Sequence, residues 1–423
     1  MIKEIFNNLL DFSEKEERAI SFFLFGLAIY SITVAFVTES RLVIIVFQLL
    51  QLASLALMLF GAITLIKFKF DNFYLSIVYT VYLLWLFVIF IGVFKYLDYS
   101  YFKSSFLGAP YGPMLYFSPL ILLFPRKFLF YRKLFTFIII FGIFYLLFNA
   151  FFIKDLLNSN TSSKRSQTIV ETLSSLSLPC GFIILTSVYH TKKRFLTALG
   201  IVIIALAFAI IRARRGLILM YSEFLFFGYL FYFFKSKSRI IILYFTLLLT
   251  LLGFLYAFQL YKPTDNKIFG FLLEKGDEDT RTGIELYFYD DMKSKDWIVG
   301  RGIEGQYFCP DIEEDQVTNY RKNIETGYLQ TILKGGLISL GLFLLIALPA
   351  VIKGVFFSKN IFSKAAGIWV LLSIINSYPT IVNGFTLEYL LVWFSIGICY
   401  SSKIRQMSEL DILMAIYPEI ENE

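Results

Sequence analysis

Cysteine, histidine and charge are all scarce in this chain of 423 residues, and each scarcity excludes a class of protein. Three scattered cysteines, Cys180, Cys309 and Cys399, support neither a disulfide framework nor a zinc site. The one histidine, His190, lies in the basic turn YHTKKR. Charged residues make up only 17% of the chain, whereas 57% is hydrophobic and the mean hydropathy is +0.69, so a soluble domain is excluded.

Aromatic and aliphatic residues are abundant instead. The 49 Phe and 27 Tyr indicate an integral membrane protein. The first twenty residues, MIKEIFNNLLDFSEKEERAI, carry charges where a signal peptide has its apolar run, so we expect insertion through the first span. The net charge of +7 comes mostly from cations at span ends, which favours membrane lipid and not nucleic acid as the partner.

The hydrophobic pattern predicts an all-α, polytopic membrane bundle. A helix that crosses about 30 Å of hydrocarbon needs about 20 apolar residues. About twelve segments approach this length: 19–38, 42–66, 73–94, 113–124, 134–153, 169–189, 195–211, 217–234, 240–260, 327–351, 365–382 and 385–400. The fourth is the weakest, because it is short and contains Pro113 and Pro119.

The distribution of basic residues predicts the orientation. With the N-terminus inside, the cytoplasmic turns collect far more Lys and Arg than the short outer turns, and His190 falls inside. Catalysis by histidine at the outer face is then excluded. The chain divides into nine spans (1–260), one large extracytoplasmic loop (261–325), three further spans (326–402) and a cytoplasmic tail (403–423).

Three arginines break the charge rule. The sequence IIRARRGLIL places Arg212, Arg214 and Arg215 at the outer membrane face, between the seventh and eighth spans. One interpretation is that they reach lipid phosphates at the interface. The other is that they form a diphosphate site, because guanidinium groups pair bidentately with phosphate oxygens.

The large loop carries two recognisable patterns. Ile284, Tyr287, Phe288 and Met292 have helical spacing, which predicts a short amphipathic helix on the membrane surface with Arg281 at its start. Glycines 300, 302 and 305 spell G-x-G-x-x-G, but no buried strand precedes them, so we interpret them as a flexible turn and not as a nucleotide site.

Several carboxylates are candidates for chemistry. The acidic runs at 277–279, 290–291 and 313–315 are typical of solvated surface and lack the spacing of a metal site, so we predict neither a metal nor a cofactor. Glu325 lies at a helix start. One interpretation is that the helix dipole favours a carboxylate there, and the other is that Glu325 is a general base among arginines. Glu223 and Glu388 lie within apolar spans, where carboxylates are costly and usually functional.

These features together resemble the O-antigen polymerase and ligase superfamily. The resemblance rests on RARRG (residues 212–216) at an outer turn, on Arg281 followed by a helix and the IVGRG turn, and on IETGYLQTILKGGLISLGLFLL entering a span. It covers residues 195–400 and implies a membrane glycosyltransferase-C type bundle whose long outer loop covers a cavity.

By this resemblance, arginines would hold the diphosphate of an undecaprenyl-diphosphate-linked glycan in the bacterial inner membrane, while an acceptor hydroxyl attacks the anomeric carbon. Glu325 and Arg281 would be catalytic, and Tyr328 and Glu388 are further candidates. The arginines expected at the diphosphate are Arg212, Arg214, Arg215 and Arg301.

The resemblance favours the polymerase branch. The ligases typically carry a histidine where this chain has glutamate, so both donor and acceptor are expected to be lipid-linked, with a chain-length regulator as a further partner. The alternatives are an O-antigen ligase, a flippase or other transporter of lipid-linked oligosaccharide, and a polyprenyl-monophosphate-dependent transferase. No repeat between the two halves is visible, which speaks against many transporter folds. The first outer loop is only Glu39, Ser40 and Arg41, which is small for a monophosphate-dependent transferase.

Overall fold

The chain folds as a bundle of helices in a computed structural model. The structure describes residues 13–39, 44–70, 72–96, 98–107, 112–156, 164–235, 280–310, 319–380 and 384–418. Within these ranges the only sheet is an antiparallel pair, β1 (Tyr307–Phe308) with β2 (Tyr320–Arg321). The predicted all-α class is therefore confirmed.

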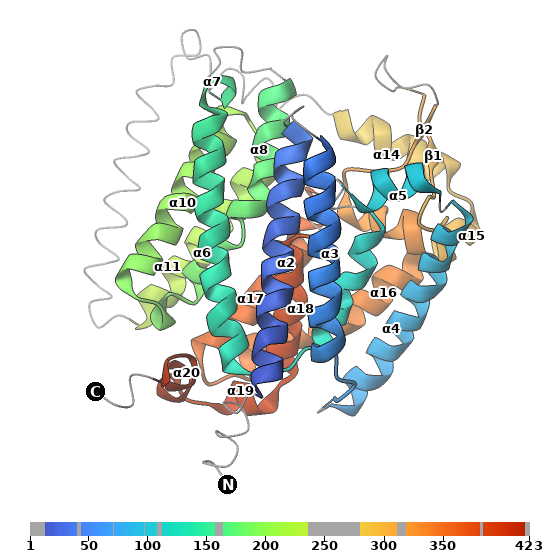
Figure 1. The fold of residues 1–423 in the computed structure, drawn as a ribbon. Coiled ribbons are helices and arrows are strands. Elements are labelled where there is room, and N and C mark those ends of the chain that lie inside the picture. Colours follow the sequence, from blue (N-terminus) through green and yellow to red (C-terminus); the bar gives the residue numbers. More distant parts are fainter. Residues whose placement is uncertain are drawn as a thin grey trace.

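The helices follow in this order: α2 (Glu14–Glu39), α3 (Ile44–Leu65), α4 (Phe73–Ile91), η1 (Gly92–Lys95), α5 (Tyr99–Phe106), η2 (Pro113–Leu123), α6 (Phe128–Phe151), α7 (Ile153–Leu156), α8 (Lys164–Ser177), α9 (Cys180–Leu185), η3 (Ser187–Tyr189), α10 (Lys192–Ile211), α11 (Arg215–Lys235), α14 (Thr280–Asp291), α15 (Ser294–Val299), α16 (Gly327–Phe356), α17 (Ile361–Asn376), α18 (Leu387–Tyr400), α19 (Ser402–Gln406) and α20 (Glu409–Ile416). The loop elements α5, α14, α15, β1 and β2 lie at one end of the bundle, and α19 and α20 lie at the other (Figure 1).

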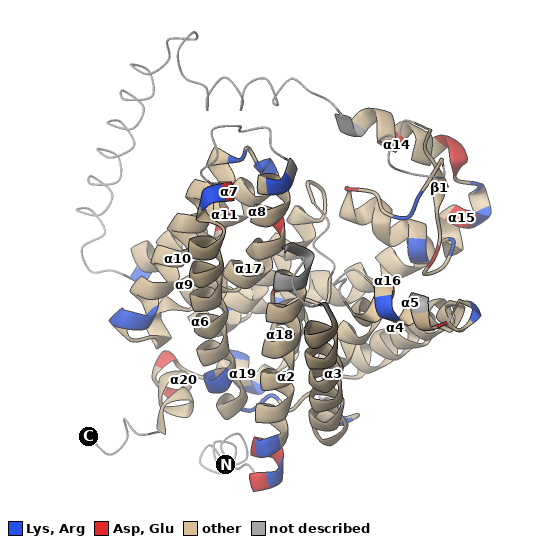
Figure 2. Ribbon diagram, turned by 45° about the horizontal axis from the view of Figure 1, so that its top comes forward, with Lys and Arg blue, Asp and Glu red and all other residues tan. Residues whose placement is uncertain are grey.

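Seven helices in the described ranges are long and apolar enough to cross a membrane, which supports a multi-pass membrane protein. Charged residues gather at the ends of these helices, and the middle stretches carry few (Figure 2). The predicted span 240–260 lies outside the described residues. Spans 113–124, 365–382 and 385–400 correspond to the shorter apolar helices η2, α17 and α18.

One predicted span is interrupted. Residues 169–189 form α8, α9 and η3 in place of a single helix, and the chain turns at Leu178 and Pro179. Proline has no amide proton to continue the helical ladder, and its ring clashes with the preceding turn. Pro179 therefore predicts the break, although the residues around it form one continuous apolar segment.

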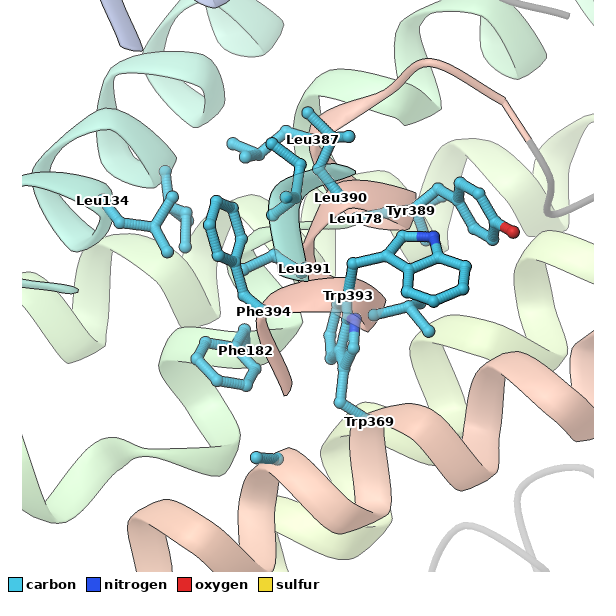
Figure 3. Close-up of a cluster of buried hydrophobic side chains, with 14 of the residues drawn as sticks. Leu134, Leu178, Phe182, Trp369, Leu387, Tyr389, Leu390, Leu391, Trp393 and Phe394 are labelled. Carbon is cyan, nitrogen blue, oxygen red and sulfur yellow. The ribbon is translucent and has the colours of Figure 1, made fainter. Parts of the chain in front are cut away.

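Helix α18 forms the centre of the bundle. All of its residues from Leu387 to Tyr400 are buried, and it packs against α16, α17, η2 and α8. Figure 3 shows Trp393, Leu390, Leu391 and Phe394 of this helix among apolar side chains from its neighbours. This buried apolar core lies directly beneath the first residues of α18.

Helix α16 is broken near its beginning. Gly336 has φ 68° and ψ −177°, so a short head (residues 327–335) is separated from a long apolar part (residues 337–356). The long part alone spans about 30 Å at a rise of about 1.5 Å per residue, which is enough for the hydrocarbon layer. The head is thus not needed to cross the hydrocarbon layer, and it can pack with the loop elements.

Candidate functional site

A cavity of about 1050 Å³ lies at the loop end of the bundle. Its walls come from α2, α4, α8, α11, the head of α16 and the start of α18, and the loop residues Ile303 and Glu304 also contribute. Polar and charged residues line it alongside apolar ones, which is unusual within a membrane bundle. In such proteins, ionisable residues that face an interior cavity mark functional sites.

Two groups of charged side chains line this cavity. We define the arginine group as Arg214, Arg215, Glu171 and Glu325, and the lysine group as Lys322, Lys334 and Glu304. Each group combines cations with carboxylates. The cavity can therefore bind an anion and also offer carboxylate oxygens that accept a proton.

The hairpin between α10 and α11 positions the arginine group. Ala213 takes a left-handed backbone conformation (φ 50°), which costs a residue with a Cβ about 1 kcal/mol. The amide of Arg214 donates to the carbonyl of Ala209 (2.9 Å) and closes the end of α10. This tight turn directs Arg214 and Arg215 to the cavity wall.

Arg214 pairs with a residue that sequence reasoning missed. Its Nη1 lies 2.9 Å from Oε1 of Glu171 on α8, and it also interacts electrostatically with Glu325. A signal for Glu171 exists in the sequence, because helical spacing puts residues 171, 174, 175 and 178 on one face, and in the structure all four line the cavity, 178 from the turn that follows α8. Three of these four side chains are polar within a segment that otherwise reads as a span.

Hydrogen bonds on both sides hold the backbone at Glu325. The amide of Ile324 donates to Oε1 of Gln330 (3.0 Å), and the amide of Gln330 donates to the carbonyl of Thr326 (2.9 Å). The Thr326 hydroxyl donates to Glu285 of α14. Glu325 itself is exposed at the cavity wall. These bonds fix the backbone around the predicted base at the cavity wall.

Ion pairs and hydrogen bonds connect the lysine group to α5 and to the glycine turn. Lys322 Nζ lies 2.6 Å from Oε2 of Glu304, and the Tyr101 hydroxyl donates to Oε1 (2.6 Å). Burial by itself raises the pKa of Glu304, but these hydrogen bonds outweigh it, so the pKa lies below its ordinary value. Lys334 Nζ donates to the carbonyl of Gly305 (2.9 Å).

Two arginines predicted at the diphosphate do not line the cavity. Arg212 is fully buried, and its guanidinium donates to the carbonyls of Asp155 and Leu156. Arg301 uses all five of its N–H donors on Asp291, Asp296 and the carbonyl of Gln306. Both side chains stabilise the fold around the site, because their donors are directed at protein oxygens.

Of the remaining predicted residues, one lines the cavity and one does not. Glu388 lines the cavity at the start of α18. Tyr328 does not, because its hydroxyl donates to the carbonyl of Ile374 and its amide to that of Ser377 (3.3 Å), which anchors the head of α16 to α17. Arg281 is the second residue of α14, and its side chain lies outside the described part of the chain.

The glycine pattern at 300–305 forms an ordered turn, which corrects the prediction of a flexible one. Gly300 and Gly302 have φ values of 73° and 80°. The amides of Arg301 and Gly302 donate to the carbonyls of Leu333 (2.8 Å) and Lys334 (3.0 Å), and the Trp85 indole donates to the carbonyl of Gly335 (3.0 Å). The turn therefore satisfies carbonyls that the break at Gly336 leaves without helical partners.

The predicted amphipathic helix exists as two helices, α14 and α15. Part of its apolar face packs inside the loop itself. Phe288 and Met292 are buried against Tyr307 and Cys309 and against the apolar side of the head of α16. The loop thus forms a small core of its own that covers the head of α16.

A scan against models of protein families, a search of curated proteins and a search of solved structures each found no match to this chain.

Proposed function

We propose that this protein is a bacterial polysaccharide polymerase that joins undecaprenyl-diphosphate-linked repeat units. The observation that carries the proposal is the cavity in which Arg214 and Arg215 lie beside the carboxylates of Glu171 and Glu325. Two adjacent guanidinium groups suit a diphosphate, and a carboxylate next to them suits a hydroxyl that must lose its proton.

In the proposed reaction, an acceptor hydroxyl attacks the anomeric carbon of the donor sugar. The new glycosidic C–O bond forms as the bond between that carbon and the diphosphate oxygen breaks. Glu325 takes the hydroxyl proton, and the lipid diphosphate leaves with the bonding electrons. Arg214 and Arg215 stabilise the charge that develops on the leaving group. Since cationic side chains supply this stabilisation, the reaction is proposed to be independent of a metal ion.

The architecture supports an enzyme that works at one face of the membrane. The cavity lies at the loop end, and the buried core around α18 fills the bundle beneath it (Figure 3). A transporter of lipid-linked oligosaccharide needs a path to the other face, so this arrangement favours the polymerase over the flippase. The ligase remains the alternative within the same chemistry.

Twelve spans, a glycosyltransferase-C type bundle, an inner-membrane location, cytoplasmic termini and an extracytoplasmic loop form part of this proposal. They rest on the hydropathy and charge pattern and on the resemblance to the O-antigen polymerase and ligase superfamily. A chain-length regulator as partner belongs to it as well.

The test uses the purified protein in detergent with an undecaprenyl-diphosphate repeat unit from its own host, with and without a chelator. A ladder of longer lipid-linked glycans that persists with chelator supports the proposal. Transfer to a lipid A core acceptor without a ladder would assign a ligase. Movement of the lipid across liposomes by the same protein, with no ladder, would assign a flippase.

A further inference from the structure

The deep wall of the cavity contains a buried carboxyl group that the proposed reaction does not use. Glu388 is only 9% exposed, and it lines both the main cavity and a small second one beside it. Its carboxyl group makes no hydrogen bond or ion pair with any residue in the described ranges. A buried carboxyl group without a partner is costly, so a group that enters the cavity is expected to satisfy it.

Three tyrosines from different elements line the same cavity: Tyr82 of α4, Tyr116 of η2 and Tyr389 of α18. The phenols interact electrostatically with one another. Among the described residues, the Tyr82 and Tyr116 hydroxyls have no hydrogen-bond partner. The Tyr389 hydroxyl and the buried indole N–H of Trp393 are likewise without a hydrogen-bond partner among the described residues.

Other buried tyrosines nearby show that the fold can satisfy such groups. The hydroxyl of Tyr30, which also lines the cavity, donates to the carbonyl of Phe106 (3.1 Å), and that of Tyr79 donates to the carbonyl of Pro119 (2.8 Å). The hydroxyls of Tyr82, Tyr116 and Tyr389 differ because they face the cavity. Figure 3 shows the Tyr389 hydroxyl pointing away from the apolar cluster around Trp393.

We infer that Glu388, Tyr82, Tyr116 and Tyr389 form a subsite for an uncharged sugar ring. This inference rests on the proposed function and assigns the glycan part of its substrate to the deep wall. A carboxyl group and three phenols offer both donors and acceptors to vicinal hydroxyls, and aromatic rings suit the apolar face of a pyranose. None of the four cations that line the cavity pairs with Glu388, so an anionic sugar finds no counter-charge there.

The test measures binding of two probes to the full-length protein in detergent by titration calorimetry. One probe is the free oligosaccharide released by mild acid from the host's lipid-linked repeat unit, and the other is inorganic pyrophosphate. We expect Glu388→Gln and Tyr116→Phe each to weaken oligosaccharide binding about tenfold or more, as expected for a lost hydrogen bond of 1.4 kcal/mol or more. Both variants should bind pyrophosphate within about twofold of the wild type.

Glu223→Gln is the matched control. Glu223 also lies in an apolar helix, but its Oε2 accepts from Nδ2 of Asn376 (2.6 Å), and it does not line the cavity. This variant should bind both probes like the wild type. Tyr116→Phe removes one half-buried hydroxyl and nothing else, so it decides the matter if Glu388→Gln does not fold.

Wild-type oligosaccharide affinity in both variants, or no oligosaccharide binding by the wild type, would overturn the subsite even if the protein polymerises. Conversely, oligosaccharide binding that these variants lose, with no pyrophosphate binding and no ladder, would retain the subsite and reject the polymerase. Equal weakening of both probes would show that the variants disturb the whole cavity, and it too would overturn the assignment.

Discussion

Arg214 and Arg215 are neighbours in the chain with different surroundings. Arg214 has a side chain 23% exposed and pairs with Glu171, whereas Arg215 is exposed at the cavity wall. A partly buried ion pair holds a guanidinium in place more firmly than an exposed one does. The ion pair with Glu171 thus preorganises Arg214 at the cavity wall.

We expect Arg214→Gln and Arg215→Gln each to lower polymerisation about 10²- to 10³-fold, because each removes a donor from the leaving diphosphate. Initial rates with the lipid-linked repeat unit measure the loss. Arg18→Gln, at the far end of the bundle in an exposed pair with Glu14, is the control and should keep wild-type rates. Wild-type rates in both cavity variants would remove the arginines from the reaction.

Glu325→Gln should lower kcat about 10²- to 10⁴-fold, the usual effect of losing a general base. Glu171→Gln breaks the ion pair with Arg214 and leaves the base in place, so its rate should fall less than about tenfold. Single-turnover rates distinguish the two. If Glu171→Gln is the more damaging substitution, Glu171 is the base and Glu325 is not.

The contribution of Glu304 to the stability of the fold should depend on pH. Its pKa in the folded protein lies below the ordinary value of 4.5, so its bonds with Lys322 and Tyr101 stabilise the fold above that pH. This stabilisation is lost as the pH falls through the lowered pKa. The wild type should therefore have a higher apparent Tm than Glu304→Gln from about pH 6 to 8, and the difference should shrink below about pH 4.5. A difference in Tm that stays constant down to pH 3 would contradict this role of Glu304.

At the scale of elements, the contact between the 300–302 turn and the break in α16 depends on glycine at two places. A Cβ on Gly336 would lie 2.0 Å from the carbonyl oxygen of Ile298, and one on Gly300 would lie 2.6 Å from the amide nitrogen of Gly335. Both residues also have positive φ. The two backbones touch, so neither side can accept a side chain.

Gly336→Ala should destabilise the protein by about 3 kcal/mol or more, because the clash is with backbone and not with a movable side chain. Gly341→Ala is a control in the same helix. Its Cβ meets nothing within 4 Å, and alanine in a helix interior is favoured by about 0.5–1 kcal/mol. Apparent Tm in detergent compares the two. Similar Tm values would show that the break can straighten.

The sequence predicts local features of these elements well and their contacts poorly. The stripe of Phe288 and Met292 and the helix around it follow from spacing alone. The break at Gly336 could not be predicted, because glycine occurs in many apolar helices without breaking them. The resemblance predicts Arg301 at the diphosphate, but Asp291 and Asp296 take its donors through tertiary contacts.

At the scale of the whole molecule, the loop elements α5 and α14 lie at the end of the bundle opposite α19 and α20, and the loop residues Ile303, Glu304 and Lys322 line the cavity (Figure 1). The charge pattern of the sequence predicts that this end faces the outside of the cell membrane. Glu171, Lys334 and Glu304 were missed because their value depends on side chains brought together from distant segments. The arginine cluster and Glu325 were each candidates from the sequence, and Arg214, Arg215 and Glu325 all line the cavity, whereas Arg212 does not.

Labelling with a membrane-impermeant maleimide tests this orientation. Cys180, Cys309 and Cys399 are all buried, so the unmodified chain should label little and can serve as background. Lys295→Cys, at an exposed position of α15, should label in intact spheroplasts. Lys359→Cys, exposed near the other end of the bundle, should label only after the membrane is opened. The reverse pattern would invert the orientation and remove the cavity from the outer face.

The turn at 300–302 has a further consequence for hydrogen exchange. Backbone amides of a polar loop normally exchange with solvent deuterium within seconds, whereas amides in a packed span exchange only when the helix opens. The amides of Arg301 and Gly302 are bonded to carbonyls of the broken helix, so their exchange requires the separation of the loop from the span. Slow deuterium uptake at these two positions would therefore report how firmly the loop is held to the broken helix.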